Sequence, residues 1–346
     1  MHVSVANSDR GFSAAPGESV LQAGLHSGLN LPYRCKGGNC GACRARLLRG
    51  AVHYPHGRPL GLSDAEVREG LILLCQARAA DDLCIDIMEV RTPDTVKIRR
   101  LPARIERTLR LSHDVLGVFL RLPAAEPFDF EPGQYLDVML DGGRRRSFSI
   151  ASPPHDARPL ELHVRRVSGG EWTPPLFAKP AANALLAIEG PLGRFVYSHD
   201  SRAPLLLVGG GTGLAPLMSI LRHVIENDLD RDMILYWGVR SERDLYAHPE
   251  LTRLAQLQPR FRYCAVLSDA GAGWNGRRGP VHQAVLDDFE ALACHDIYMS
   301  GPPAMIAAAL CDFAARGARP QRLFFESFDY APDTLERQRW TAASKA

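Results

Sequence analysis

The sequence predicts a multidomain chain of mixed α+β and α/β class, in which an antiparallel β-barrel precedes a parallel α/β domain. Three observations predict this class. The length of 346 residues exceeds what one hydrophobic core usually serves. Short strand candidates separated by turn signals fill residues 103–201. From residue 204 onward strands alternate with helical stretches, which is typical of a parallel sheet.

The overall composition excludes several classes of protein. An apolar share of 46%, a charged share of 23% and a formal net charge of +2 are ordinary for globular chains and give no sign of a nucleic-acid partner. No run of eighteen apolar residues occurs, and the first dozen residues lack a basic start followed by an apolar stretch. We therefore expect a cytoplasmic protein with no nucleic-acid or membrane partner.

The N-terminal domain is expected to cover residues 1–95. It begins as a strand and a turn, followed by a helix over residues 19–27, where apolar residues fall at helical spacing. A Cys-rich loop follows, and a strand-like stretch covers residues 83–90. The polar and basic segment RTPDTVKIRRLP at 91–102 contains two prolines, so we place the first domain boundary and a candidate hinge there.

The two remaining domains are expected at residues 96–201 and 202–332. The strand candidates of the first are GVFLRL, QYLDVML, RSFSIA, LELHVRRV and ALLAIEGP, with no long helix between them. The strand candidates of the second are LLLVGGG, MILYWGV, FRYCAVLS, HDIYMSG and RLFFESF. Residues 333–346 have no clear period and are expected to be a flexible tail.

Four cysteines carry the strongest motif in the chain. Cys35, Cys40, Cys43 and Cys75 have the spacing C-x4-C-x2-C followed by a distant Cys, by which plant-type ferredoxins hold a [2Fe-2S] cluster. Three thiolates must converge from one loop, and the glycines between them let the backbone fold tightly. A structural zinc site is the alternative, but zinc motifs favour paired C-x2-C knuckles and the second knuckle is missing.

The other cysteines and the basic residues near the loop are less informative. Cys84, Cys264, Cys294 and Cys311 have apolar neighbours and are expected to be small buried hydrophobes without function. The basic residues could steer an acidic partner toward the cluster or could form an ordinary solvated surface, and both interpretations stay open. These basic residues are Arg34, Lys36, Arg44, Arg46 and Arg49.

The segment RSFSIA at 146–151 resembles the R-x-[YF]-[ST] flavin motif of the ferredoxin-NADP reductase superfamily. The resemblance implies that Arg146 pairs with the flavin pyrophosphate, that Phe148 packs on the isoalloxazine, and that Ser149 lies near flavin N5. Ser147 lies within the same motif. An ordinary edge strand carrying Arg and Ser is the alternative.

Two later segments support the flavin interpretation. HVRRVSGGEWT follows at the distance expected in the family, and EGPLGRF resembles the G-P-x-G turn that closes the flavin domain. The resemblance implies contacts to the flavin phosphates, where glycines let backbone amides approach. The residues concerned are His163, Val164, Arg165, Gly169, Gly170 and Thr173.

The segment LLLVGGGTGLAP places glycines between a strand and a helix, so that amides at the helix start can face a pyrophosphate. It lacks the full G-x-G-x-x-G spacing, because Leu214 stands where the last glycine belongs. It resembles instead the GGGTGxAP loop of the reductase superfamily. That resemblance implies that Thr212 lies near the nicotinamide and that Pro216 shapes the helix start. The predicted nucleotide-binding residues of this loop are Gly211, Thr212, Gly213 and Pro216.

Two further segments resemble the family near its reaction centre. YMSGPPAM resembles the C-G-P-P-x-M loop, with Ser300 in place of cysteine followed by Gly301 and Pro302. RLFFESF resembles the closing strand, which implies that Glu326 lies near the reacting atoms and that Phe328 covers the flavin. An ordinary core aromatic is the alternative for Phe328. The predicted catalytic residues are Ser149, Ser300 and Glu326.

The nicotinamide preference should depend on the residues after the second parallel strand. There an acid favours the ribose hydroxyls and arginines favour a 2′-phosphate. Both kinds occur at Arg240, Ser241, Glu242 and Arg243. We expect NADH, with NADPH possible.

Together these resemblances cover nearly all of residues 1–332. The chain resembles reductase components of bacterial multicomponent ring-hydroxylating oxygenases, and also CDP-6-deoxy-Δ3,4-glucoseen reductases. This implies a β-grasp [2Fe-2S] ferredoxin domain, a β-barrel FAD domain and an α/β NAD(P)H domain. It also implies a monomeric reductase that passes electrons from NAD(P)H through FAD and [2Fe-2S] to a terminal oxygenase. An electron donor for a deoxysugar dehydratase and an iron-sulfur sensor or binding module are the alternatives.

Overall fold

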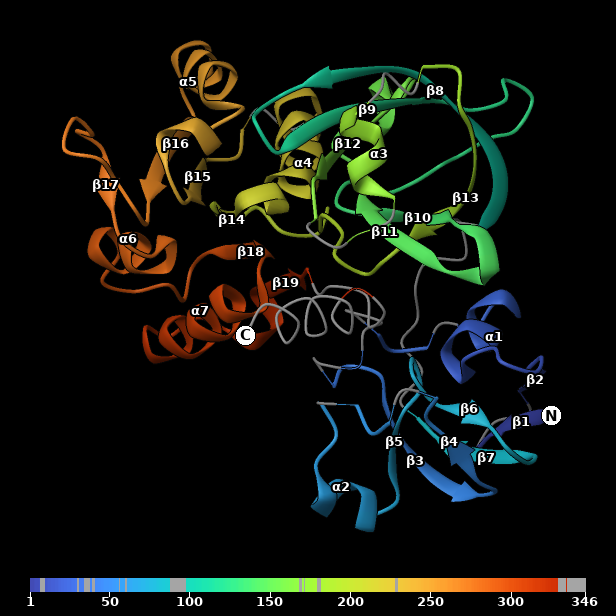
Figure 1. Cartoon of the computed structure of the whole chain (residues 1–346). Helices are drawn as coiled ribbons and strands as arrows, with labels where there is room; N and C mark the ends of the chain where they lie inside the picture. Colours follow the sequence, from blue (N-terminus) through green and yellow to red (C-terminus); the bar gives the residue numbers. More distant parts are fainter. Residues whose placement is uncertain are drawn as a thin grey trace, which may run out of the picture. The chain divides into compact units, whose positions relative to one another are not determined.

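A computed structural model gives the architecture of the chain. It describes residues 1–6, 10–29, 31–33, 38, 41–55, 57–59, 61–87, 98–167, 170, 172–178, 182–227, 230–328 and 334. The chain divides into two compact units, the first formed by Met1–Ile98 and the second by Arg99–Phe328. The flavin-type barrel and the parallel sheet therefore share one unit. Each unit is described separately below (Figure 1).

The first unit is a small mixed sheet with one main helix. The sheet has the order β2-β1-β7-β3-β5, in which β1 pairs parallel with β7 and the other pairs are antiparallel. Helix α1 begins after Ser19, whose side chain accepts a hydrogen bond from the backbone of Gln22. The elements are β1 (His2–Val5), β2 (Gly11–Ser13), α1 (Val20–His26), β3 (Arg44–Arg49), β4 (Val52–His53), α2 (Asp64–Arg68), β5 (Leu71–Leu73), β6 (Arg78–Ala79) and β7 (Leu83–Asp86).

The second unit opens with a six-stranded antiparallel sheet of order β11-β10-β13-β8-β9-β12. A bridge between Ile150 and Leu162 joins its two ends, so the sheet closes into a barrel. The barrel interior is filled by alternate residues such as Val118, Leu136 and Ile188, all 0% exposed. The elements are β8 (Arg99–Arg110), β9 (Val115–Arg121), β10 (Tyr135–Met139), η1 (Asp141–Gly143), β11 (Arg145–Ser149), η2 (Pro154–Asp156), β12 (Leu160–Arg165), α3 (Thr173–Ala178) and β13 (Leu185–Leu192).

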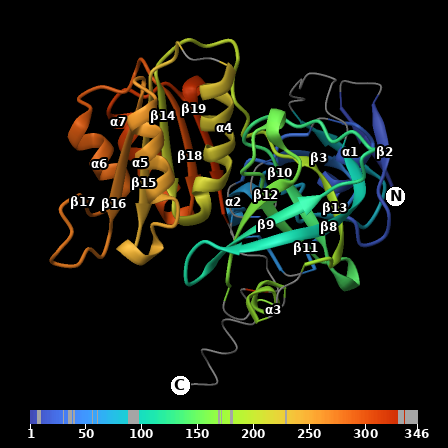
Figure 2. The ribbon, with the colours of Figure 1, turned by 90° about the horizontal axis from the view of Figure 1, so that it is seen from above.

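The remainder of the second unit is a parallel sheet of order β17-β16-β15-β14-β18-β19. Helices cover both faces of this sheet, with α4 and α5 on one face and α6 and α7 on the other (Figure 2). The elements are β14 (Leu205–Gly210), η3 (Gly211–Gly213), α4 (Leu214–Asn227), β15 (Met233–Val239), η4 (Glu242–Asp244), α5 (His248–Leu257), β16 (Phe261–Leu267), β17 (Arg277–Arg278), α6 (Val281–Asp288), β18 (Asp296–Gly301), α7 (Pro303–Ala315), η5 (Pro320–Arg322) and β19 (Leu323–Ser327).

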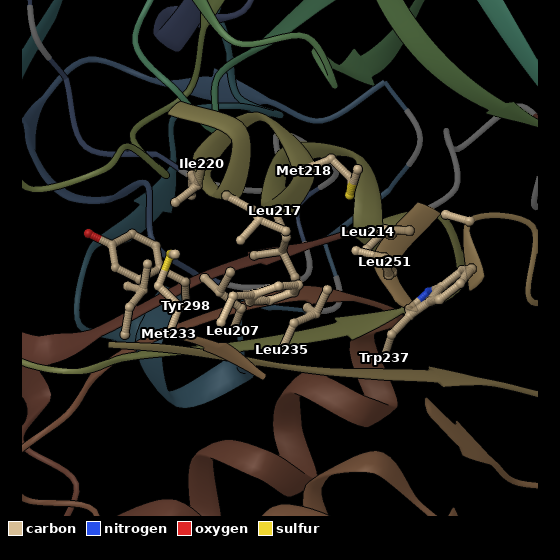
Figure 3. Close-up of a cluster of buried hydrophobic side chains, with 14 of the residues drawn as sticks. Leu207, Leu214, Leu217, Met218, Ile220, Met233, Leu235, Trp237, Leu251 and Tyr298 are labelled. Atoms are coloured by element: carbon tan, nitrogen blue, oxygen red, sulfur yellow. The ribbon is translucent and has the colours of Figure 1, made fainter. Parts of the chain in front are cut away.

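The larger apolar core of the parallel sheet lies under α4. Leu214, Leu217 and Met218 of this helix pack over Leu207 and Leu235 of the sheet, and all five are 0% exposed (Figure 3). Burial on this scale stabilises each large side chain by roughly 1.5–3 kcal/mol. The packing anchors α4, whose first turn follows directly on the glycine loop of β14.

The fold class predicted from the sequence is confirmed, and two details need correction. Strand β8 begins at Arg99, so the last four residues of RTPDTVKIRRLP belong to the barrel and Pro102 pairs with Ala187 inside a strand. Cys294 and Cys311 are exposed rather than buried, because one lies in a turn and the other on the outer face of α7. Cys84 and Cys264 are partly buried.

The candidate hinge and the predicted tail lie largely outside the described residues. Residues 88–97, where the candidate hinge begins, lie outside them, as does the predicted tail apart from Thr334. Among the described residues, no helix combines the length and the apolar character that crossing a membrane requires.

Candidate functional site

Two of the four predicted cluster ligands lie close together in the core of the first unit. Cys43 is 2% exposed and Cys75 is 5% exposed. The backbone N–H of Leu74 donates to the carbonyl of Cys43 (3.0 Å), which ties the segments that carry the two cysteines. Burial raises the pKa of the Tyr54 hydroxyl, and the charges of the Cys43 and Cys75 thiolates add to the shift. Cys35 and Cys40 lie outside the described residues.

Two glycines of the cluster loop adopt a left-handed backbone conformation that favours glycine. Gly41 has φ +70°, and a Cβ there would overlap the guanidinium of Arg44. Gly38 has φ +84°, and a Cβ there would lie 2.8 Å from Gln76 and 2.9 Å from Pro59. Side chains therefore pack directly against the backbone at both glycines. Buried thiolates in a glycine cradle fit a [2Fe-2S] cluster.

Arg44 fastens this loop to the rest of its unit. Its Nη2 donates to the Gly61 carbonyl (2.9 Å), and its Nε pairs with Glu66 (2.7 Å) in the first turn of α2. Arg46 donates to the carbonyl of Glu69 (2.7 Å). These two arginines have protein partners, whereas Arg34 and Lys36 lie outside the described residues. Arg49 is exposed.

The three predicted catalytic residues gather at the boundary between the barrel and the parallel sheet. Ser149 ends β11 of the barrel, and its Oγ donates to Glu326 Oε2 (3.2 Å) on β19. Ser300 of β18 is the strand partner of Glu326 in the parallel ladder. Ser149, Ser300 and Glu326 are 8%, 0% and 7% exposed. Strands from both domains thus place three polar side chains together in a buried position.

The same boundary provides a test of whether a cofactor fits. Within the described residues, Ser300 Oγ is fully buried and has no hydrogen-bond partner. A buried hydroxyl left without a partner costs free energy, which a bound polar group would recover. Gly193, in the turn after β13, has φ +101°, and a Cβ there would lie 2.8 Å from the Tyr135 ring and 3.8 Å from Glu326 Oε1. The unpartnered Ser300 hydroxyl fits a polar ligand at this boundary, whereas Gly193 lets Tyr135 and Glu326 pack closely beside it.

The glycine loop after β14 makes the closest backbone approach. A Cβ on Gly213 would overlap the carbonyl of Ser300, and a Cβ on Gly210 would lie 2.8 Å from Pro302 Cδ. The loops after β14 and β18 therefore touch through backbone. These two strands flank the position where the strand order reverses, and parallel sheets bind nucleotides at such a position. This arrangement fits a dinucleotide.

The remaining residues of these loops surround the same point. Thr212 is partly buried and Pro216 is buried in the first turn of α4. Gly301 is buried, and its carbonyl accepts from the backbone N–H of Phe328 (2.9 Å). Phe328 is partly buried.

The predicted flavin motif lies on β11 with its side chains alternating. Arg146 Nη1 donates to the Arg145 carbonyl (2.8 Å), and Ser147 Oγ donates to Asp137 Oδ1 (2.6 Å). The ring of Phe148 lies 5.0 Å from that of Trp172, at an interplanar angle of 46°. Each of these three side chains therefore contacts another group of the protein. The flavin contacts that the family resemblance implies for them stay predictions.

The residues of the second predicted flavin segment do not all lie at the same place. Val164 is 0% exposed in the barrel core, and Thr173 Oγ1 accepts from the backbone of Val167 (3.0 Å). Gly170 N–H donates to the Val167 carbonyl (3.0 Å). Gly169 lies outside the described residues. These contacts form a tight turn into α3.

His163 and Arg165 of this segment face the nicotinamide-type domain. His163 contacts Tyr246 and Glu161 through its two ring nitrogens, at 3.0 Å and 3.1 Å. Arg165 Nε lies 3.1 Å from Asp114 Oδ2, and a Cβ on Gly211 would lie 2.9 Å from Arg165 Nη1. Both residues therefore reach across the boundary instead of lying on the barrel surface.

Residues 240–243 follow β15, as expected. Arg240 Nε lies 3.5 Å from Asp269 Oδ2, and both side chains are more than two-thirds exposed. Ser241 and Asp244 form a capping box, with Ser241 Oγ donating to Asp244 Oδ2 (2.8 Å). Glu242 and Arg243 are exposed. This short turn therefore presents an acidic and a basic side chain to solvent.

Four residues of the site were not predicted from the sequence. Trp237 Nε1 donates to the Gly211 carbonyl (2.9 Å), and Tyr246 packs edge-on against Trp237 at 5.0 Å. Arg222 Nη1 donates to Glu161 Oε2 (2.7 Å). The alternation of polar residues in the strand segment ELHVR could have indicated Glu161, but no local signal marks the other three.

Family models match all three parts of the chain. Residues 3–80 match a 2Fe-2S iron-sulfur cluster binding domain, residues 102–197 an oxidoreductase FAD-binding domain, and residues 207–310 an oxidoreductase NAD-binding domain. The fold and the site therefore define an iron-sulfur flavoprotein oxidoreductase whose cofactors are a [2Fe-2S] cluster, FAD and a nicotinamide nucleotide.

Proteins that match this chain over nearly its whole length define the family more closely. Reductase component 2 of terephthalate 1,2-dioxygenase from Comamonas sp is 33% identical over 331 residues, covering 95% of this chain and 98% of the relative. The CDP-6-deoxy-L-threo-D-glycero-4-hexulose-3-dehydrase reductase of Yersinia pestis is 32% identical over 317 residues, covering 92% and 95%. The crystal structure of the Amycolatopsis cytochrome P450 reductase GcoB matches with a TM-score of 0.84 and 36% identity, covering 96% and 99%.

The chain belongs to the iron-sulfur flavoprotein reductases of the ferredoxin-NADP reductase superfamily that carry an N-terminal ferredoxin domain, a family that includes oxygenase reductase components. It is an NAD(P)H-dependent electron-transfer enzyme. The alternative of a non-enzymatic iron-sulfur sensor is thereby set aside.

Proposed function

We propose that the chain supplies electrons to a terminal oxygenase. The observation that carries this proposal is the match of the whole domain order, at similar length, to reductase components of the Comamonas dioxygenase and to a cytochrome P450 reductase. When bound, the nicotinamide supplies two electrons as hydride, FAD holds them, and the cluster passes them on singly. The protein's contribution is to bind, to align and to exclude water.

The residues at the boundary have defined tasks in this proposal. The amides of the glycine loop face the nucleotide pyrophosphate at the start of α4, where the helix dipole favours an anion. Ser300 Oγ, which is buried without a partner among the described residues, hydrogen-bonds a polar group of the nicotinamide. Glu326 accepts from Ser149 Oγ and would hold that hydroxyl in place for a bound flavin.

Burial at this boundary also excludes water from the reacting atoms. Ser149, Ser300 and Glu326 are each less than 9% exposed, although all three are polar. A water-poor site strengthens the hydrogen bonds that orient the two rings. It also protects a reduced flavin from side reactions.

We further propose NADH as the preferred donor. Arg240 lies near Asp269 (3.5 Å), so a carboxylate competes with a 2′-phosphate for this guanidinium. Glu242, in the first turn of η4, repels a phosphate and accepts from ribose hydroxyls. We expect kcat/KM for NADH to exceed that for NADPH by about tenfold, or about 1.4 kcal/mol. Steady-state ferricyanide reduction with each donor measures this ratio.

The reductase is proposed to act in the cytoplasm as a monomer. One chain carries matches to all three cofactor-binding domains, so a single copy holds the whole electron route. A thiolate-held cluster and a nicotinamide donor suit a reducing compartment. Sedimentation of the purified protein tests the monomer.

A dehydrase partner is the second candidate, because the Yersinia relative matches at nearly the same identity and coverage as the Comamonas one. A coupled assay separates the two. Purified reductase and NADH are added either to the oxygenase or to the deoxysugar dehydrase that is encoded nearest to the gene of the reductase. Hydroxylated product formed only with the reductase present supports the oxygenase, whereas turnover of the dehydrase alone favours the second candidate. Turnover of neither partner rejects both.

A further inference from the structure

Three alternate residues of β12 form a polar row that faces the parallel-sheet domain. Glu161, His163 and Arg165 share one face of the strand, because side chains alternate with a period of two. Glu161 Oε2 accepts from Arg222 Nη1 (2.7 Å) on α4, and His163 Nδ1 lies 3.0 Å from the hydroxyl of Tyr246. The row therefore contacts two different elements of that domain.

The third member of the row reaches the glycine loop itself. A Cβ on Gly211 would lie 2.9 Å from Arg165 Nη1, so the guanidinium rests against the loop. Asp114, from the turn between β8 and β9, lies 3.1 Å from Arg165 Nε and forms an ion pair with it. One barrel strand thus contacts α4, Tyr246 and the glycine loop.

A second route leads from His163 to the same glycine. Tyr246 packs edge-on against the indole of Trp237, with ring centroids 5.0 Å apart. Trp237 is 0% exposed, and its Nε1 donates to the Gly211 carbonyl (2.9 Å). Gly211 has φ +57°, so this donor holds the loop in a left-handed conformation. The barrel therefore contacts Gly211 both directly and through Tyr246 and Trp237.

The ionised state of Glu161 fixes the direction of its hydrogen bond with His163. Burial opposes ionisation of Glu161, but the hydrogen bond from His163 and the charges of His163 and Arg222 outweigh it and lower the pKa of Glu161 to about 2. Glu161 is therefore an ionised acceptor near neutral pH, and His163 Nε2–H donates to it (3.1 Å). Burial raises the pKa of Tyr246, which keeps its hydroxyl protonated as the partner of Nδ1.

We propose that His163 is a positioning residue for hydride transfer, which holds the glycine loop of the nicotinamide domain in register with the flavin barrel through Tyr246 and Trp237. His163 acts through these two neighbours. A small displacement of the loop would move the nicotinamide relative to the flavin, and a misplacement of about 1 Å can cost about 100-fold in rate.

Two variants test this role. Tyr246→Phe removes the hydroxyl but keeps the ring against Trp237, and His163→Phe removes both hydrogen bonds. In anaerobic rapid mixing, each should lower the limiting rate of flavin reduction by NADH about tenfold, while the FAD content stays that of the wild type. The limiting rate of the double variant should also fall about tenfold rather than about 100-fold, because both single changes break the same contact between His163 and Tyr246.

The chain offers a matched control in Tyr263→Phe. Tyr263 pairs with His248 (3.1 Å) by the same chemistry, but both residues belong to the parallel-sheet domain. This variant should keep the wild-type limiting rate. Hydrogen exchange at the amides of residues 211–213 should accelerate in Tyr246→Phe and not in Tyr263→Phe. A general structural role would instead lower the melting temperature in both variants and leave the limiting rate unchanged.

The proposal is overturned if Tyr246→Phe reduces its flavin as fast as Tyr263→Phe, or if its slower reduction follows a loss of FAD. His163→Phe changes the flavin barrel itself, so a loss of FAD in that variant would not test the proposal. The deciding variant is Tyr246→Phe, because Tyr246 belongs to the parallel-sheet domain. The inference depends on the proposed NADH oxidation. If the wild type fails to reduce its flavin, that function fails; if the wild type succeeds and Tyr246→Phe matches it, only this inference fails.

Discussion

The cluster loop and the boundary between barrel and parallel sheet gather their functional groups over very different lengths of chain. In the cluster loop, three of the four predicted ligands come from nine consecutive residues, 35–43. At the boundary, Ser149 and Glu326 form a hydrogen bond across 177 positions. The first site can fold with its own small unit, whereas the second exists only when two domains pack correctly.

The two sites should fail in different ways. Loss of one thiolate removes a bond to the cluster and leaves the boundary unchanged, because the boundary shares no ligand with the loop. Loss of one boundary group leaves the cluster unchanged but alters the alignment on which hydride transfer depends. A cluster variant should therefore lose only the reduction of acceptors that need the cluster, whereas a boundary variant, which acts before the flavin is reduced, should slow the reduction of every acceptor.

The largest effect is expected from Cys43→Ser. Changes to groups that only support a metal ligand typically cost about 10–100-fold, so loss of the ligand itself should lower NADH-dependent cytochrome c reduction at least ~100-fold. Ferricyanide reduction, which can take electrons from the flavin, should persist. Steady-state assays with both acceptors measure the two effects.

Cys84→Ser is the matched control for this experiment, because Cys84 lies in the same unit on β7 and is no predicted ligand. It should keep both activities. Equal loss of ferricyanide reduction in Cys43→Ser would contradict the separation of the two regions.

A smaller but still large effect is expected from Glu326→Gln. The variant keeps the size of the side chain but replaces one carboxyl oxygen by an amide nitrogen that donates, which disturbs the hydrogen bond from Ser149 Oγ to Oε2 (3.2 Å). The limiting rate of flavin reduction by NADH should fall about 100-fold, while the cluster content stays at the wild-type value. Rapid-mixing absorbance measures the rate, and exposed Glu290→Gln serves as the control. An unchanged rate would remove Glu326 from the account.

The smallest effect is a pH dependence of stability at the boundary. Burial, followed by the charges of His199 and His155, lowers the pKa of His223 from 6.5 to about 4. Between these values the unfolded chain binds more protons, so stability falls as pH drops from 6.5 toward 4. Urea unfolding of His223→Gln should show a weaker loss across this window than the wild type. Parallel pH profiles of the two proteins would contradict the assignment.

Local patterns carried most of the correct predictions. The cysteine spacing, the glycine loop after β14 and five barrel strands are each contained in short segments, so their residues could be read without knowing the partners. Strand β8 was not named among the strand candidates, because its arginines alternate with few strongly apolar residues and it contains Pro102.

Non-local contacts escaped prediction for physical reasons. Trp237 lies in an apolar strand, where a buried aromatic looks like ordinary core although its Nε1 holds Gly211. The exposure of Cys311 was missed because α7 is rich in alanine and its buried face is weakly marked. The roles of Glu161 and Arg222 depend on packing between two domains, which no single segment encodes.

The most direct test of the central claim is anaerobic addition of excess NADH to the purified protein, so that enough electrons are present for both FAD and the cluster, followed by absorption and electron paramagnetic resonance. The account predicts that flavin absorption is lost and that the signal of a reduced [2Fe-2S] cluster appears in the wild type but not in Cys43→Ser. A flavin that stays oxidised, or a reduced flavin with no cluster signal in the wild type, would contradict it.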